Sequence, residues 1–208
     1  LSFDSGLITI SLRSLYVTLT ALTISTLIAF PLAAFLAVTN FHFRQAIIAT
    51  LNALMGLPPV VVGLIVYIIF SRSGPLGVLG LLYTTSAMII AQAIIITPLV
   101  TSIAHQSMQE LWADYRNLLI SINVSKMQSV GILMWDSKKA LITASLAGFG
   151  RGIGEVGAIM IVGGNIDNAT RVLTTAISLE TSRGDFALAL ALGFVLISLA
   201  ISVSFATH

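Results

Sequence analysis

Two charged residues within a membrane-length apolar run are the groups in this sequence best suited to chemistry. Arg151 and Glu155 lie four residues apart in the glycine-rich stretch 148–158, so a helix would place them on one face, where they could pair. A charge at the centre of a bilayer costs roughly 2.5–3.5 kcal/mol on insertion scales, so such residues face protein or water. The pair predicts either a gate beside a solute pathway, together with Gly154, or an ion pair that locks a helix bundle.

The glycines around this pair indicate close helix packing. A helix without side-chain bulk on one face lets a neighbouring helix approach its backbone. The glycines of the stretch are Gly148, Gly150, Gly152, Gly154 and Gly157. We therefore expect this helix to lie inside the molecule, against other helices.

The overall composition indicates a membrane protein. The 208 residues are 57% hydrophobic and 9% charged, whereas soluble domains carry about 25% charged residues. The net charge of +2 is too small for a nucleic-acid-binding protein, and the absence of cysteine excludes disulfides and thiolate metal sites. The sequence contains no phosphate-binding loop and no hydrolase or metalloprotease pattern. We expect no catalytic residue, no metal site and no enzymatic activity on this chain.

Five apolar runs are long enough to cross a bilayer, which needs about 20 residues per helix. They are 15–38, 46–70, 86–103, 140–162 and 186–206. Pro58 and Pro59 predict a helix kink in the second run, because proline removes a backbone hydrogen bond. The polar residues Asn52, Gln92 and Thr97 are expected to hydrogen-bond between helices. The predicted fold class is an all-α polytopic membrane protein with five core transmembrane helices.

The segment 105–139, between the third and fourth runs, is amphipathic and carries charges. Helical spacing would place Leu118, Leu119 and Ile122 on one face, and Asn123 adopts a left-handed turn more easily than most residues. The segment predicts a helix–turn–helix that lies flat on the membrane surface. It would either contact a soluble partner or rest on lipid headgroups.

Four short motifs carry a resemblance to a known family. They are Leu-Pro-Pro-Val-Val-Val-Gly at 57–63, Ser-Arg-Ser-Gly-Pro-Leu-Gly at 71–77, the glycine-rich stretch at 148–158, and Ile-Met-Ile-Val-Gly-Gly-Asn-Ile at 159–166. Over nearly its whole length the chain resembles the permease subunit of binding-protein-dependent ATP-binding cassette (ABC) importers for molybdate, sulfate and tungstate. The last motif is most similar to the tungstate branch. The resemblance implies a single transmembrane permease domain over 1–208, with a cytoplasmic coupling segment at about 105–139.

The coupling loop of this family carries an E-A-A pattern, a glycine six residues after its glutamate, and a later Leu-Pro. These features align with 117–119, Asn123 and 134–135, and none of the key residue types is present here. Ser125 and Lys126 fit the family pattern just after the turn. The resemblance assigns ATPase coupling to Asn117, Leu118, Leu119, Asn123, Ser125 and Lys126.

The resemblance also implies the assembly. The chain would form a homodimer in the lipid of the cytoplasmic (inner) membrane of a prokaryote, with the coupling segment and the C-terminus inside. Two ATP-binding cassette subunits, which hold ATP and magnesium, would sit beneath it, and an extracytoplasmic oxyanion-binding protein would dock on the opposite face. The chain itself would hold no cofactor and bind no nucleic acid. The expected cargo is tungstate, with molybdate next. Because the chain opens at Leu1 rather than at methionine, we expect its natural start to lie upstream.

Two alternatives remain at this point. The chain could be a stand-alone secondary anion transporter or channel, which would move anions without any ATPase. It could also be a non-transporting membrane assembly subunit, in which neutralising Arg151 would leave flux unchanged.

Overall fold

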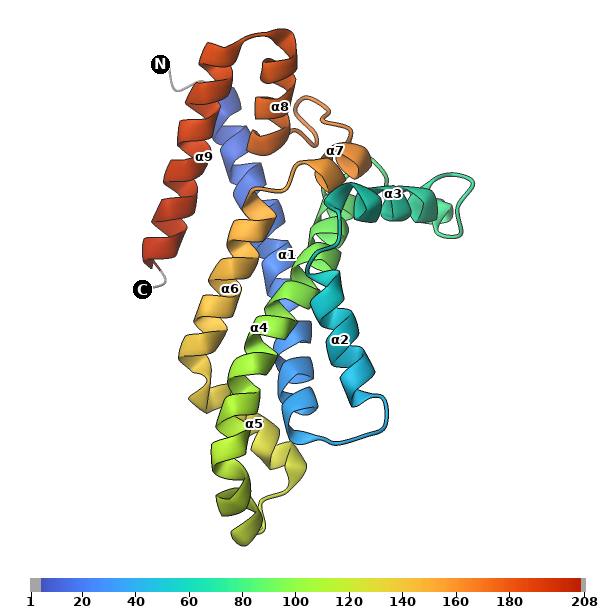
Figure 1. The fold of residues 1–208 in the computed structure, drawn as a ribbon. Coiled ribbons are helices and arrows are strands. Elements are labelled where there is room, and N and C mark those ends of the chain that lie inside the picture. The colour runs from blue at the N-terminus through green and yellow to red at the C-terminus, as the bar shows by residue number, and fades with distance from the viewer. Residues whose placement is uncertain (1–4, 207–208) are drawn as a thin grey trace.

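The computed structural model describes residues 5–206, and over this range the chain forms helices and no strand (Figure 1). The long helices run lengthwise through the molecule and short helices gather at its two ends. The elements are α1 Ser5–Val38, α2 Arg44–Leu54, α3 Pro59–Phe70, the 3-10 turn η1 Gly77–Leu79, α4 Thr85–Ser121, α5 Lys126–Asp136, α6 Lys138–Ile153, α7 Gly157–Gly163, α8 Leu173–Arg183 and α9 Phe186–Ala206.

Helices α1 and α4 form the centre of the molecule and pack against each other along much of their length (Figure 1). Many of the side chains buried in them are small. They include Ala29, Ala33 and Ala37 in α1, and Ala91 and Ala104 in α4. Small residues let helix backbones approach closely where lipid gives little hydrophobic force between helices. Helix α6 joins this pair and completes the central bundle.

Three of the described helices, α1, α4 and α9, are long and apolar enough to cross a membrane. Two bent pairs, α2 with α3 and α6 with α7, reach that length only when each pair is taken together. The five predicted runs correspond to these three helices and two pairs, and the all-α polytopic fold class is confirmed.

The second run differs from the prediction of one kinked helix. Helix α2 ends at Leu54, α3 begins at Pro59, and their axes differ by 104°. Pro58 is extended, with φ −64° and ψ 121°, and Pro59 occupies the first turn of α3. A residue that precedes proline is pushed out of the helical region, whereas proline itself fits a helix start. The proline pair therefore ends one helix and starts another.

Helices α4 and α9 occupy opposite environments. In the most apolar window of α4, 67% of the residues are buried, but only 11% are buried in that of α9. Helix α9 packs mainly on α8 and exposes large apolar side chains such as Phe194 and Phe205. Its outer face is therefore suited to lipid, whereas α4 is the axis of the molecule.

Candidate functional site

The end of α4 and the start of α5 form a compact hairpin at one end of the molecule (Figure 1). Asn123 has φ +54°, so the predicted left-handed turn is confirmed. Around it, Val124 N donates to Leu119 O at 3.0 Å and Asn123 N donates to Ile120 O at 3.1 Å. This pair of bonds is the Schellman arrangement, which satisfies the last carbonyls of a helix.

The hairpin's second helix has its own start signal. Gln128 N donates to Ser125 Oγ at 3.3 Å, and Ser125 N donates to Gln128 Oε1 at 2.9 Å. This reciprocal capping box satisfies two backbone donors at the start of α5. The hairpin is therefore specified by local hydrogen bonds on both sides of its turn.

The exposed side of the hairpin is unusually apolar. Leu118 and Ile122 are each 61% exposed, and Met127 is 81% exposed. The assigned coupling residues Asn117, Asn123, Ser125 and Lys126 are exposed as well. Apolar side chains held on a rigid, capped hairpin are typical of a surface that contacts another molecule.

Two predictions about this segment were wrong. Leu119 does not share the face of Leu118 and Ile122, because it is only 6% exposed and points into the chain. It can act on a partner only by supporting its exposed neighbours. The first half of the hairpin does not lie flat either, because α4 continues without interruption to Ser121. A helix of 37 residues is about 55 Å long, whereas a bilayer core is about 30 Å thick, so α4 projects out of the membrane.

The stretch that carries Arg151 and Glu155 is broken rather than helical throughout. Helix α6 ends at Ile153, α7 begins at Gly157, and their axes differ by 58°. The ion pairs among residues 5–206 are Arg171 with Asp167 and Arg183 with Glu180, so the predicted pairing of Arg151 with Glu155 is wrong. The break turns the two side chains out of the i,i+4 relation that one helix would give them.

Glu155 takes part in the break itself. Its side chain is buried, at 4% exposure, and its Oε1 accepts a hydrogen bond from Ala158 N at 3.3 Å. Its backbone oxygen accepts from Thr174 Oγ1 at 3.0 Å, and Gln92 Nε2 donates to Gly152 O at 2.8 Å. The backbone groups freed by the break are thus bound by side chains from α4 and α8. The bond of Gln92 confirms its predicted interhelical role, whereas Thr97 donates to Ala93 O within α4.

Four of the five glycines of this stretch divide into two groups, and a Cβ added at the fifth, Gly157, would lie 2.8 Å from Val60 Cγ2 of α3. A Cβ added at Gly148 would lie 2.6 Å from Val100 Cγ2, and one added at Gly152 would lie 2.8 Å from Ile96 Cδ1. These two glycines permit the close contact of α6 with α4. Gly150 and Gly154 are exposed and meet no side chain from another helix. Arg151 is half-buried and forms no hydrogen bond among the described residues, so a gating role for Arg151, Gly154 and Glu155 stays a prediction.

The two helix breaks meet at the end of the molecule opposite the hairpin (Figure 1). A Cβ added at Gly63 of α3 would lie 2.7 Å from Ala158 Cα of α7. The second helix of each bent pair therefore packs backbone to backbone against the other.

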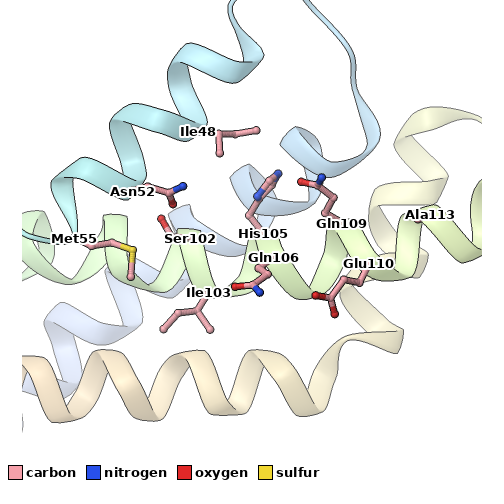
Figure 2. A pocket seen from close by; sticks show the side chains of 10 residues that line it. All are labelled: Ile48, Asn52, Met55, Ser102, Ile103, His105, Gln106, Gln109, Glu110 and Ala113. Atoms are coloured by element: carbon pink, nitrogen blue, oxygen red, sulfur yellow. The ribbon is translucent and has the colours of Figure 1, made fainter.

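A cleft of about 500 Å³ with a mixed polar and apolar lining lies between α2 and α4 on the side facing the hairpin end. Figure 2 shows Asn52 of α2 facing Ser102 of α4, with the ring of His105 further along α4, between Ser102 and Gln109. We call it the α2–α4 cleft and define it by its lining: Ile48, Asn52, Met55, Ser102, Ile103, His105, Gln106, Gln109, Glu110 and Ala113.

Two polar atoms at this cleft lack partners. His105 Nε2 and Ser102 Oγ are buried and form no hydrogen bond. A buried polar group left unpaired costs about 1–3 kcal/mol, so a ligand or water that binds these two atoms would offset that cost. Arg44, at the start of α2, donates from Nε to Leu36 O at 2.6 Å and from Nη2 to Gln109 Oε1 at 3.5 Å. The lining of the cleft therefore combines neutral polar groups with the carboxylate of Glu110, and the cation of Arg44 reaches it through Gln109.

Sequence reasoning missed this cleft. Asn52 was predicted to hydrogen-bond to another helix, but among the described residues it forms no such bond and lies at the cleft instead. A signal was present in the sequence, because Ser102, His105, Gln106 and Gln109 recur at the spacing of one helix face. Within residues 5–206, no group of three or more His, Cys, Asp or Glu side chains could hold a metal ion.

Comparison with known proteins gives a consistent set of relatives. A tungstate uptake system permease protein from Peptoclostridium acidaminophilum is 38% identical over 98% of this chain and 89% of its own length. A probable anion ABC transporter permease protein from Haloferax volcanii is 34% identical over 95% of the chain and 88% of its length. A second tungstate uptake permease, from Campylobacter jejuni, is 38% identical over 81% of the chain and 71% of its length. No protein-family model matches the chain.

Proposed function

Because this chain belongs to the permease proteins of ABC-type anion uptake systems, we propose that it forms the membrane pathway of an ATP-driven importer for tungstate, with molybdate as the next candidate. It is a multi-pass protein of the cytoplasmic membrane, with helices suited to that setting. Tungstate and molybdate are tetrahedral dianions of similar shape, so shape and charge alone support both.

The α4–α5 hairpin is the observation that carries the proposal. An uptake permease needs a surface on which an ATPase can act, and that surface must be rigid enough to transmit movement. The hairpin supplies exposed Leu118, Ile122 and Met127 on a turn whose ends are both capped. We assign ATPase contact to this surface, with Asn117, Asn123, Ser125 and Lys126 around its apolar residues.

The assembly that supports this function has several parts. A second copy of the chain completes the pathway, two ATP-binding cassette subunits contact the hairpins, and a binding protein delivers the oxyanion at the opposite end. ATP and magnesium belong to the ATPase subunits, and this chain needs no cofactor of its own. The relatives are permease components of transport systems, in keeping with a transport role for this chain.

Helix α4 offers a direct mechanical link in this proposal. It begins beside the α6–α7 break, where Gln92 binds Gly152, and it ends in the hairpin that ATPase subunits would push. A continuous helix transmits displacement along its axis because its backbone bonds are short and directional. Movement at the hairpin would therefore reach the broken helices along this one helix, which continues through Pro98.

Site-specific crosslinking tests the proposal. The sequence has no cysteine, so Asn123→Cys supplies the only thiol on this chain. The variant is co-expressed with the ATPase and binding protein, treated with a short bifunctional thiol reagent, and analysed by mass spectrometry. We expect a crosslink to a P-loop ATPase, together with ATP-dependent tungstate uptake in proteoliposomes.

The matched control is Val78→Cys, because Val78 is fully exposed and lies in η1, next to α3, which packs on α7 rather than on the hairpin. It should give no ATPase crosslink. Anion uptake by the purified chain without any ATPase would instead favour a secondary transporter. Recovery of a complex that moves no oxyanion would favour an assembly subunit.

A further inference from the structure

We propose that the α2–α4 cleft is a transit site for the oxyanion at the inner end of the pathway, where neutral hydrogen-bond donors hold the anion between the bundle and the cytoplasm. This inference rests on the proposed function, since it names a binding station within that transport path.

The position of the cleft suits such a site. Helix α4 begins at Thr85, and a bilayer core takes about 20 helical residues, so Ser102 to Glu110 lie where α4 leaves the apolar layer. The same helix continues to the hairpin, so the cleft lies between the membrane-spanning part of α4 and the proposed ATPase surface. No residue of α2 is buried, which leaves the cleft side of that helix open.

The chemistry of the cleft suits a tetrahedral dianion. Ser102 Oγ and His105 Nε2 are buried and unpartnered, so a rotation of either side chain toward the cleft would let it donate to an oxygen of the anion without first breaking another bond. Asn52, across the cleft on α2, adds an amide donor that faces Ser102, and Gln106 adds a second amide to the lining from α4. Donors that converge from two helices match an anion whose oxygens point to the corners of a tetrahedron.

The charge balance suits passage rather than tight binding. Arg44 reaches the rim through Gln109 and attracts the anion, whereas the carboxylate of Glu110 repels it. No lysine or arginine lines the cleft itself. Conduction requires a site that is favourable enough to enter and weak enough to leave. A volume of about 500 Å³ also accommodates an anion with water, since one water occupies about 30 Å³.

Thiol protection tests the site directly. Gln106→Cys places a single thiol at the cleft of the otherwise cysteine-free chain. The complete importer carrying this variant is modified with a small negatively charged methanethiosulfonate reagent, with and without sodium tungstate. We expect tungstate to slow modification of Gln106→Cys and sodium chloride at equal ionic strength to have no effect. Val78→Cys, which lies outside the cleft, should be modified at the same rate under both conditions.

A second pair of variants tests the role of His105. In the Gln106→Cys background, His105→Phe keeps a ring but removes the donor, and His105→Gln keeps a donor. Loss of one hydrogen bond to a charged ligand weakens binding by roughly tenfold or more, so His105→Phe should need about tenfold more tungstate for the same protection. His105→Gln should need nearly the same tungstate concentration for protection as the Gln106→Cys chain that keeps His105.

The outcomes separate the site from the function. Equal modification with and without tungstate overturns the transit site, and so does a thiol that no reagent reaches, because another protein surface then covers the cleft. Protection that survives His105→Phe overturns the assignment of the donor. Tungstate uptake measured in the same proteoliposomes tests the proposed function separately. An importer that moves no oxyanion would contradict the proposed function, whatever the thiol-protection result.

Discussion

The break between α2 and α3 and the break between α6 and α7 both interrupt an apolar run of membrane length, but they do so by different means. At the first break, Pro58 and Pro59 exclude a continuous helix by their own geometry. At the second, glycines only permit the break, and Gln92, Thr174 and the Glu155 side chain bind the freed backbone groups.

A single proline does not suffice for a break, because α1 continues through Pro31 and α4 continues through Pro98. Two adjacent prolines act locally, whereas a glycine-rich helix breaks only where other helices supply hydrogen-bond partners. The first break should therefore tolerate changes in its surroundings better than the second.

The largest effect is expected where the two breaks meet. Gly63→Val forces a side chain against the Ala158 backbone, which cannot yield as a flexible side chain can. We expect the free energy of unfolding to fall by about 3 kcal/mol, which is the upper part of the range for overpacking. This corresponds to a fall of roughly 6–12 °C in the thermal midpoint for a chain of this size. Tryptophan fluorescence during heating in detergent would measure it, and an unchanged midpoint would show that α3 and α7 do not touch.

The next largest effect concerns the cap of the second break. Glu155→Ala removes the acceptor for Ala158 N. Because the cap is missing and a buried donor is left unpaired, we expect the free energy of unfolding to fall by about 2 kcal/mol. Glu155→Gln keeps an acceptor oxygen and should regain most of the stability. The readout is the same thermal midpoint.

Arg151→Gln is the matched control for the cap. Arg151 has no bonding partner among the described residues, so its neutralisation should change stability by no more than about 0.5 kcal/mol. If Arg151→Gln and Glu155→Ala destabilise the protein equally, the two residues act as an ion pair and the capping account fails.

A smaller effect is expected within α6. The methyl group of Gly152→Ala would contact Ile96 Cδ1, the end of a side chain that can move, so the overpacking cost is small. Better helix propensity offsets part of it, and we expect the free energy of unfolding to fall by about 1 kcal/mol. Gly150→Ala meets nothing and should be neutral or stabilising by up to about 1 kcal/mol. Equal effects of the two changes on the thermal midpoint would argue against the close contact of α6 with α4.

The smallest effect is expected at the proline pair. In Pro59→Ala, alanine also fits the first turn of a helix, but the unfolded chain gains conformational freedom. We therefore expect the free energy of unfolding to fall by about 0.4–1 kcal/mol. A midpoint shift larger than that of Glu155→Ala would show that the first break depends on its surroundings, contrary to the comparison drawn above.

Much of the fold could be predicted from single residues and their periodicity. The five apolar runs, the left-handed turn at Asn123 and the amphipathic segment before α6 follow from local chemistry, and all are present in the structure. The exposure of Leu119 could not be predicted, because its direction depends on how α5 folds back onto the bundle.

The candidate sites were predicted less well for the same reason. Arg151 and Glu155 have the spacing of a helical pair, yet the break that separates them depends on Gln92 and Thr174, which are distant in sequence. The polar residues of α4 in the cleft share one face by spacing alone. Their partner Asn52 reaches them only because α2 turns back along α4.

The sequence by itself determined that the chain is a membrane protein of the all-α class, where its apolar runs approximately lie, and the turn of the hairpin. Each of these depends on composition or on hydrogen bonds between near neighbours. Only the tertiary structure decided where the apolar runs break, which glycines are in close contact, and which polar groups share a cleft. Those features depend on backbone and side-chain groups brought together from separate helices, and no local pattern of residue types specifies such a meeting.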